Sequence, residues 1–147
     1  MVKIGVKKLR DDAKLPAFST THAAGADIYL PSAVNLVHRY GVQHVPLGFA
    51  LDIPEGYEVQ IRAKSGLALK YGITLTNGIG TIDSDYKDEI GILLSSFRPD
   101  STIVFPKGTK IAQLVVNKIT PTQYMEVREL SDTDSNRNGG FGSTGDY

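Results

Sequence analysis

Two carboxylates flank a serine within residues 77–86, and these side chains have the right chemistry to activate a water molecule. Asp83 and Asp85 are separated by one residue, so on a strand both point to the same side. A carboxylate can act as general base for a water about 3 Å away when a metal ion already neutralises the negative charge of the phosphate under attack. The simpler interpretation is a surface turn, where aspartate is common.

The same segment is typical of a hairpin that could pair with a nucleobase. It starts at the dipeptide Asn77-Gly78, and a second glycine, Gly80, permits a tight backbone. A narrow hairpin exposes amides and carbonyls that can pair with the edge of a base, and the Asn77 side chain both donates and accepts. Tyr86 is then either a core aromatic or a ring pressed against a sugar. A plain Asn-Gly turn is the alternative.

Residues 65–72 predict a short helix with Ser65 as its N-cap and Gly72 at its end. The first N–H groups of a helix have no partner inside the helix and attract an anion. Lys64 lies directly beside them. This pattern favours a phosphate site, and the alternative is an ordinary capped connector helix.

Residues 137–145 combine four glycines with one aromatic ring. Such a backbone can approach a ligand closely and present amide donors, while Phe141 offers a flat face for a base and Arg137 a fork for phosphate. The alternative is a disordered tail. After about residue 128 the composition becomes polar, and residues 131–147 are typical of an arm that leaves the domain body.

Short apolar and β-branched runs, separated by Gly, Pro and Asp, predict an all-β fold. The runs are residues 2–6, 28–30, 34–37, 45–53, 57–61, 73–75, 90–97, 102–105, 111–119 and 124–127. Their even spacing favours a sandwich or jelly roll over alternating strands and helices. A chain of 147 residues with 41% hydrophobic content fits one domain.

The charge balance limits the kinds of partner that the protein can bind. Lys plus Arg and Asp plus Glu both number 16, so there is no overall basic field, and we expect no stable nucleic-acid binding. No cysteine is present, and the three histidines lack metal-ligand spacing. No run has signal-peptide or membrane-spanning length. We therefore expect a cytoplasmic protein, or one of the host cytoplasm if virally encoded, without membrane association.

Five motifs in order carry a resemblance to a known family. They occupy residues 24–29, 63–70, 77–86, 108–114 and 137–145. With them, the chain resembles the homotrimeric dUTPases, the deoxyuridine 5'-triphosphate nucleotidohydrolases. The resemblance implies a jelly-roll-like β domain over residues 1–128 with one short helix. It also implies a flexible carboxy-terminal arm over residues 129–147 that closes over the active site of another subunit of a homotrimer.

The resemblance implies hydrolysis of dUTP to dUMP and pyrophosphate, which limits uracil incorporation into DNA and supplies dUMP. Asp83 would activate water for in-line attack on the α-phosphorus. Tyr86 would lie under the deoxyribose and exclude a 2′-hydroxyl. The residues that the resemblance places in contact with substrate are Lys64, Ser65, Gly66, Asn77, Gly80, Thr81, Ile82, Tyr86, Gln113, Arg137, Phe141, Gly142 and Ser143. Mg²⁺ would be held by the substrate phosphates without a direct protein ligand, and Asp27 would either act on it through water or brace the site.

The chain departs from the family pattern at two places. Lys64 stands where the family usually has arginine, so a point charge replaces a bidentate fork, and Arg62 could compensate. The arm is one residue shorter than usual between Arg137 and the double glycine. Because an extended residue spans about 3.3 Å, this difference affects the register of Arg137.

Two other functions are alternatives to dUTP hydrolysis. A dCTP deaminase shares the fold, but its usual Ser-Ser-x-Ala-Arg and Thr-Leu-Glu segments are not found in this sequence. A binding protein whose arm is ordered by a nucleotide, with slow hydrolysis, would use the same residues. Replacing Asp83 with Asn separates the two classes, since an enzyme loses turnover and keeps affinity for dUTP.

Overall fold

The computed structural model describes residues 1–37, 41–98 and 102–132 of the chain. Within these ranges the chain forms twelve strands and one short helix. The elements are β1 (Gly5–Lys8), β2 (Ala17–Phe18), β3 (Ala26–Tyr29), β4 (Val34–Val37), β5 (Gln43–Pro46), β6 (Phe49–Asp52), β7 (Tyr57–Ala63), α1 (Ser65–Tyr71), β8 (Ile73–Leu75), β9 (Gly80–Ile82), β10 (Gly91–Ser96), β11 (Thr102–Phe105) and β12 (Lys110–Lys118).

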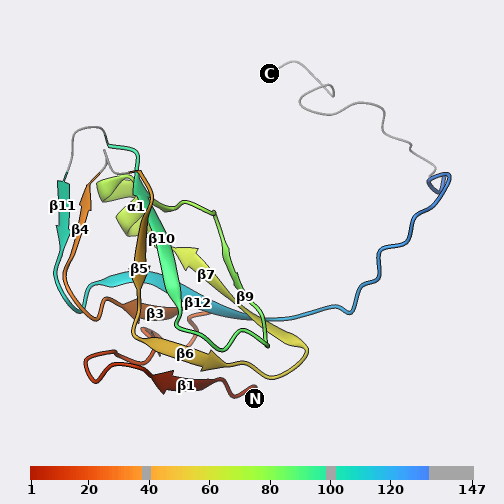
Figure 1. The fold of residues 1–147 in the computed structure, drawn as a ribbon, viewed down its shortest axis with the longest axis horizontal. Coiled ribbons are helices and arrows are strands. Elements are labelled where there is room, and N and C mark those ends of the chain that lie inside the picture. Colours follow the sequence, from red (N-terminus) through yellow and green to blue (C-terminus); the bar gives the residue numbers. More distant parts are fainter. Residues whose placement is uncertain (38–40, 99–101, 133–147) are drawn as a thin grey trace.

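The strands form four antiparallel sheets (Figure 1). The largest has the order β2-β3-β12-β7-β9, and a second has the order β5-β10-β8. Two strand pairs, β1-β6 and β11-β4, complete the body. The prediction of an all-β, jelly-roll-like domain with one short helix is confirmed. In the described ranges no helix has the length and apolar character needed to cross a membrane.

Alternation along the strands places apolar side chains between the sheets. On β10, Ile92 and Leu94 are buried while Leu93 points outward. Ile28 on β3 and Phe49 on β6 are completely buried in the same core. The outward positions of the same strands are therefore free to carry polar groups.

Several strand bounds agree with the sequence prediction, and one predicted strand is divided. β4, β8 and β11 occupy the predicted ranges. The predicted run 45–53 forms two strands, β5 and β6, because the chain turns at Gly48. The φ angle of Gly48 is 78°, a left-handed conformation that favours glycine.

Helix α1 ends as predicted but begins differently. Gly72 closes it with a φ of 64°, and its N–H donates to Ala68 O at 2.9 Å. The predicted cap at Ser65 is wrong, since Lys64 is the N-cap residue and has no side-chain cap hydrogen bond. Ser65 is instead the first helical residue.

The predicted strand over residues 124–127 is also wrong. After β12 the described chain continues to residue 132 without a strand and runs away from the body (Figure 1). Tyr124 is 95% exposed and Leu130 is 88% exposed. A strand needs a partner for its backbone hydrogen bonds, and none of the described segments pairs with this one.

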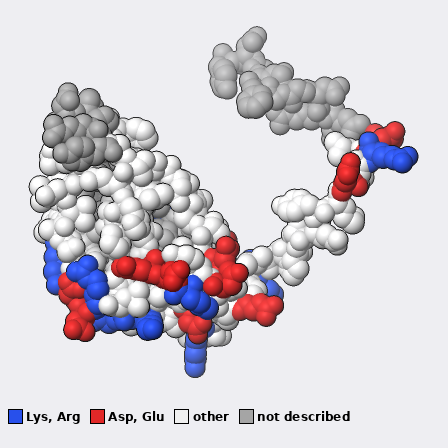
Figure 2. Space-filling model, viewed as in Figure 1, with Lys and Arg blue, Asp and Glu red and all other residues white. Residues whose placement is uncertain are grey.

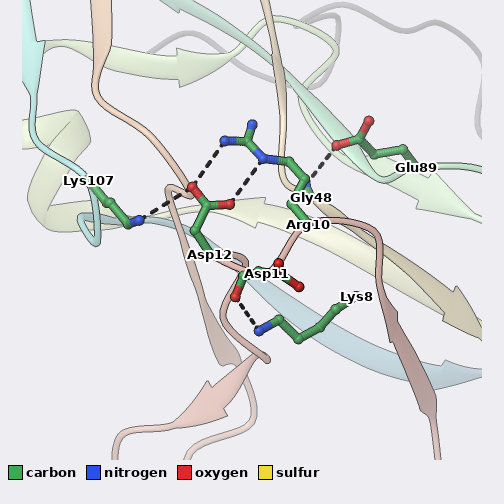
Figure 3. A network of polar contacts seen from close by, with 7 residues as sticks. All are labelled: Lys8, Arg10, Asp11, Asp12, Gly48, Glu89 and Lys107. Carbon is green, nitrogen blue, oxygen red and sulfur yellow. Dashed lines mark hydrogen bonds and ion pairs between the residues drawn. The ribbon is translucent and has the colours of Figure 1, made fainter.

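A network of polar contacts ties the loop between β1 and β2 to the loop before β12 (Figure 3). Arg10 donates two hydrogen bonds of 3.1 Å to the Asp12 carboxylate, and Lys107 donates to the same carboxylate at 3.3 Å. The hydrogen bond from Arg10 lowers the pKa of Asp12. Because all three side chains are partly exposed, the network mainly positions its loops and adds little stability.

Candidate active site

Three neighbouring strands carry a row of polar side chains on one face of the largest sheet. β12 pairs with β3 and with β7, which places Asp27 opposite Gln113 and Gln113 opposite Arg62. Residues opposite one another in antiparallel strands point to the same side. Ile28, next to Asp27, points into the core. The alternation of β3 therefore sets a carboxylate on the outer face.

Asp27 lies at the centre of an ionic cluster. Its Oδ1 accepts a hydrogen bond from Lys64. Its Oδ2 accepts from Ser19 Oγ at 2.5 Å and pairs with Lys110 Nζ at 2.7 Å. Lys110 also donates to Ser19 Oγ at 2.7 Å. Because only 4% of Asp27 is exposed, these donors and not water stabilise the negative charge of its carboxylate.

The cluster keeps Asp27 ionised. Burial acts to raise the pKa of the Asp27 carboxyl, but hydrogen bonds from Lys110, Lys64 and Ser19 outweigh burial and hold that pKa well below its usual range. The hydrogen bond to Asp27 raises the pKa of Lys110 in turn. One carboxylate thus faces two ammonium groups, which leaves this corner of the sheet with a net positive charge.

Gln113 is held against the backbone of Gly25. Its Nε2 donates to Ala63 O at 3.2 Å, next to Lys64. A Cβ atom at residue 25 would lie 2.3 Å from Gln113 Oε1, so only glycine leaves space for this amide. The first and fourth motifs therefore meet here, and Gln113, Asp27 and Lys64 form one cluster.

The start of α1 lies beside the same cluster. The N–H groups of Leu67 and Ala68 donate to Lys64 O at 3.1 and 3.0 Å. Ser65 and Gly66 occupy the first turn and are exposed, and a Cβ on Gly66 would meet nothing within 4 Å. The backbone N–H groups of Ser65 and Gly66 come before these two bonds and have no intrahelical acceptor, so an anion beside Lys64 would find donors there.

Arg62 is directed away from this cluster. Its guanidinium donates to Gln60 Oε1 at 2.7 and 3.1 Å, and Gln60 donates to Glu58 Oε1 at 2.7 Å. These three side chains form a chain of contacts along β7. In this arrangement Lys64 and not Arg62 is the cation next to the helix start.

Residues 77–86 do not form a hairpin paired with itself, and this prediction is wrong. β8 pairs with β10, whereas β9 pairs with β7 in the largest sheet. The turn at Asn77-Gly78 therefore carries the chain from one sheet to another, with Gly78 at a φ of 73°. Asn77 and Gly80 line a small recess together with the first residues of β10.

The other residues of this segment lie along β9 and the turn after it. Thr81 is exposed opposite Gln60, while Ile82 is opposite Val59 and packs against the core. Tyr86 is not a core aromatic, because it is 41% exposed and its hydroxyl donates to Glu89 O at 3.0 Å. Its backbone N–H donates to Asp83 O at 3.2 Å, which fixes Tyr86 and Asp83 in one turn.

Asp83 and Lys64 lie at opposite ends of β7 in one chain. Ile82 pairs with Val59, so Asp83 follows near the start of β7, where it lines an open hollow with Glu55 and Ile119. Lys64 comes directly after the other end. The five residues from Val59 to Lys64 span about 17 Å along a strand. One copy of the chain therefore does not bring these two groups together.

Four predicted site residues lie outside the described residues: Arg137, Phe141, Gly142 and Ser143. In contrast, Ser19 and Lys110 belong to the cluster and were not predicted. Lys110 stands three residues before Gln113 within the fourth motif, and a lysine inside a motif was the available signal. Ser19 carried no comparable signal.

The described side chains do not form a site that would hold Mg²⁺ directly. No group of three or more His, Cys, Asp or Glu suited to a metal ion occurs among the described residues. Both Asp27 oxygens already accept hydrogen bonds, and two ammonium groups beside them would repel a cation. Asp27 thus fits a bracing role better than a metal-supporting one.

The fold and the cluster together define the class: a jelly-roll-like β domain with two lysines on one buried carboxylate beside a helix start. A family profile described as dUTPase matches residues 11–145, and the chain belongs to the dUTPase family. It is 44% identical over 144 residues to a deoxyuridine 5'-triphosphate nucleotidohydrolase of Hydrogenobaculum sp., covering 98% of this chain and 99% of that one. A protein of the same name from Syntrophotalea carbinolica is 46% identical over 145 residues, covering 98% and 97%.

Solved structures share the fold. A mutant dUTPase of Staphylococcus bacteriophage 80alpha with dUpNHpp superposes with a TM-score of 0.85 at 24% identity, and the match covers 97% of this chain and 98% of that one. The dUTPase of phage phi11 of S. aureus, which coordinates a structural Mg(II) ion, has a TM-score of 0.77 at 24% identity, with 86% and 97% covered.

Proposed function

We propose that this protein hydrolyses dUTP to dUMP and pyrophosphate, which limits uracil incorporation into DNA and supplies dUMP. The observation that carries the proposal is the match over nearly the whole chain to proteins named as deoxyuridine 5'-triphosphate nucleotidohydrolases. The cationic cluster around Asp27 supports it, because a triphosphate needs cations and amide donors at one place.

At the phosphate end of the substrate, Lys64 supplies charge while Ser65 and Gly66 supply donors at the helix start. Gln113 contacts the phosphates through water, from the position in which Gly25 and Ala63 hold it. Asp83 takes a proton from the attacking water as that water adds to the α-phosphorus in line with the departing pyrophosphate. The bond between the α-phosphorus and the bridging oxygen then breaks.

At the nucleoside end, Asn77 and the backbone of Gly80, Thr81 and Ile82 recognise uracil and deoxyribose. The recess lined by Asn77 and Gly80 supports this placement. Tyr86 excludes a 2′-hydroxyl, in keeping with its exposed position in the same turn as Asp83. From the arm, Arg137, Gly142 and Ser143 contact the phosphates and Phe141 stacks on uracil.

A complete site requires more than one copy of the chain, and we propose a homotrimer. The first reason is the separation of about 17 Å between Val59, opposite Ile82, and Lys64, which calls for Asp83 and Lys64 to come from different copies.

Exposed apolar surface gives a second reason. An apolar groove of about 400 Å³ lies on the body, lined mainly by Val2, Ile4, Val6, Leu15, Phe18 and Val116. The segment after β12 is also apolar, with the exposed side chains Tyr124, Met125, Val127 and Leu130. Contact between this segment of one copy and the groove of another would remove both apolar surfaces from water. A strand-forming segment that pairs with none of the described segments of its own chain fits this arrangement.

Three further parts of the proposal concern the metal ion, the place where the protein works and nucleic acids as partners. Mg²⁺ accompanies the substrate phosphates, and the protein itself supplies no ligand to it. The protein works in the cytoplasm, where its nucleotide substrate is found. Figure 2 shows acidic and basic side chains interspersed at the lower edge of the molecule, so this face has no field of one sign for a nucleic acid.

Product analysis tests the proposal. Purified protein with Mg²⁺ is offered dUTP, dCTP, dTTP and UTP separately while pyrophosphate, orthophosphate and ammonia are followed. We expect pyrophosphate from dUTP alone, and none from the Asp83→Asn variant although it still binds dUTP. Ammonia from dCTP would indicate a deaminase. Binding of dUTP without product would indicate a nucleotide-gated binding protein.

A further inference from the structure

The Asp27 carboxylate has two cationic partners, and they occupy different oxygen atoms. Lys64 donates to Oδ1, whereas Lys110 and Ser19 both contact Oδ2, at 2.7 and 2.5 Å. If Lys64 moves away, Oδ2 keeps an ammonium partner and a hydroxyl donor. The carboxylate is then still neutralised, although its side chain is only 6% exposed.

The two lysines differ in how they are held. Lys110 Nζ has two acceptors, Asp27 Oδ2 and Ser19 Oγ, each at 2.7 Å. Lys64 is held by Oδ1 of the same carboxylate and stands directly before the exposed helix start. A lysine carries a compact charge on a flexible stem, so Lys64 can exchange one anionic partner for another. An arginine that held both oxygens as a fork could not do so without breaking two hydrogen bonds.

Removal of Lys110 would change this balance. Lys64 would become the sole cationic partner of a buried carboxylate, and taking it away would leave an uncompensated charge, which is strongly unfavourable. Lys64 would then be locked on Asp27 and lost to any phosphate at the helix start.

We propose that Lys110 is a positioning residue: by neutralising Asp27 it releases Lys64 to bind the substrate phosphate. This inference rests on the proposed function, in which Lys64 contacts the triphosphate. Lys110 acts through Asp27 and does not touch the substrate. Lys64, which replaces the usual arginine before Ser65, therefore shares the Asp27 carboxylate with Lys110.

The test is a double-mutant cycle on Lys110 and Asp27. Dissociation constants for dUpNHpp are measured by calorimetry, and kcat/KM for dUTP by pyrophosphate release. Lys110→Met should weaken dUpNHpp binding by roughly 10- to 100-fold, the worth of a hydrogen bond to a charged group. In the Asp27→Asn background the same substitution should have no effect, because no buried charge is left to hold Lys64. Lys110→Arg, which keeps the positive charge, should bind nearly as tightly as the wild type.

Lys107→Met is the matched control for the loss of one positive charge. Lys107 lies in the loop before β12 and donates to Asp12 at 3.3 Å (Figure 3). It should change binding by less than about threefold, as expected of an exposed pair.

Two results would overturn the inference: wild-type affinity in Lys110→Met, or an equal loss with and without the Asp27 carboxylate. The second result would mean that Lys110 contacts phosphate itself. If Lys110→Met does not fold, Asp27→Asn with and without Lys110→Met still decides the matter, because unequal affinities contradict the proposal. Wild-type protein that binds dUpNHpp but releases no pyrophosphate from dUTP would refute the proposed function and leave the binding cycle interpretable.

Discussion

Gly25 leaves no space for a side chain, and its replacement by alanine should displace Gln113. A Cβ atom at residue 25 would lie 2.3 Å from Gln113 Oε1 and 2.9 Å from its Cδ. Non-bonded atoms rest about 3.5 Å apart, so the amide must move by about 1 Å. That movement breaks the hydrogen bond of 3.2 Å from Nε2 to Ala63 O.

The expected cost follows from these two changes. Loss of one hydrogen bond lowers the free energy of unfolding by about 0.5–1.5 kcal/mol, or a few degrees in Tm. A shift of about 1 Å in a group that positions the substrate can lower the rate by about 100-fold. We therefore expect kcat/KM for dUTP to fall between about 10-fold and about 100-fold in Gly25→Ala, with a smaller effect on stability.

The assay is steady-state pyrophosphate release, combined with thermal unfolding of the same preparations. Gln113→Ala is the control, because it removes the atoms that the new methyl group would strike. Adding Gly25→Ala to Gln113→Ala should then cost no further activity. A further loss of activity of more than about threefold would show that the new methyl group disturbs the backbone and not the Gln113 side chain. Wild-type kcat/KM in Gly25→Ala would refute the role given to Gln113.

Tyr86→Ala should admit UTP, measured as a rise in kcat/KM for UTP relative to dUTP, and continued exclusion would show that the ring is not the sugar gate. Deletion of residues 137–147 should remove most of the turnover and leave the oligomer intact by light scattering, so an unchanged rate would contradict a closing arm. Asp27 has a lowered pKa in the folded state, so its charge stabilises the protein above about pH 3.9 and ceases to do so as the pH falls further. The urea midpoints of wild type and Asp27→Asn should therefore keep a constant gap above about pH 5 and approach each other as the pH falls below about 3.9, and a gap that stays constant down to about pH 2 would argue against the ion cluster.

The sequence predicts strand bounds well where local composition determines them. It predicts them less well where a strand depends on the segment that pairs with it. Residues 34–37 and 73–75 are short apolar runs between turn residues, and their bounds agree with β4 and β8. The dipeptide Asn77-Gly78 does form a turn, but a turn signal does not specify which strands it joins. Residues 124–127 have strand-forming composition without a partner in the described chain, so the pattern alone predicted a strand that is absent.

The candidate site was predictable in part for a related reason. Lys64 and Gln113 could be named from their motifs, and the structure brings them together beside Asp27. Lys110 also lies in a motif, but its role and that of Ser19 depend on contacts between segments far apart in sequence. Only the structure shows that two lysines, one after β7 and one on β12, share the carboxylate of Asp27 on β3.

The length of β7 also bears on how the amount of protein in a cell controls its chemistry. In the proposed assembly a single chain has no active site of its own, because Asp83 and Lys64 lie toward opposite ends of β7. In the proposed assembly, hydrolytic capacity rises more steeply than in proportion to the number of chains when chains are scarce. One defective chain also disables sites to which its neighbours contribute sound residues, so a mixed population loses more activity than the fraction of defective chains alone would suggest.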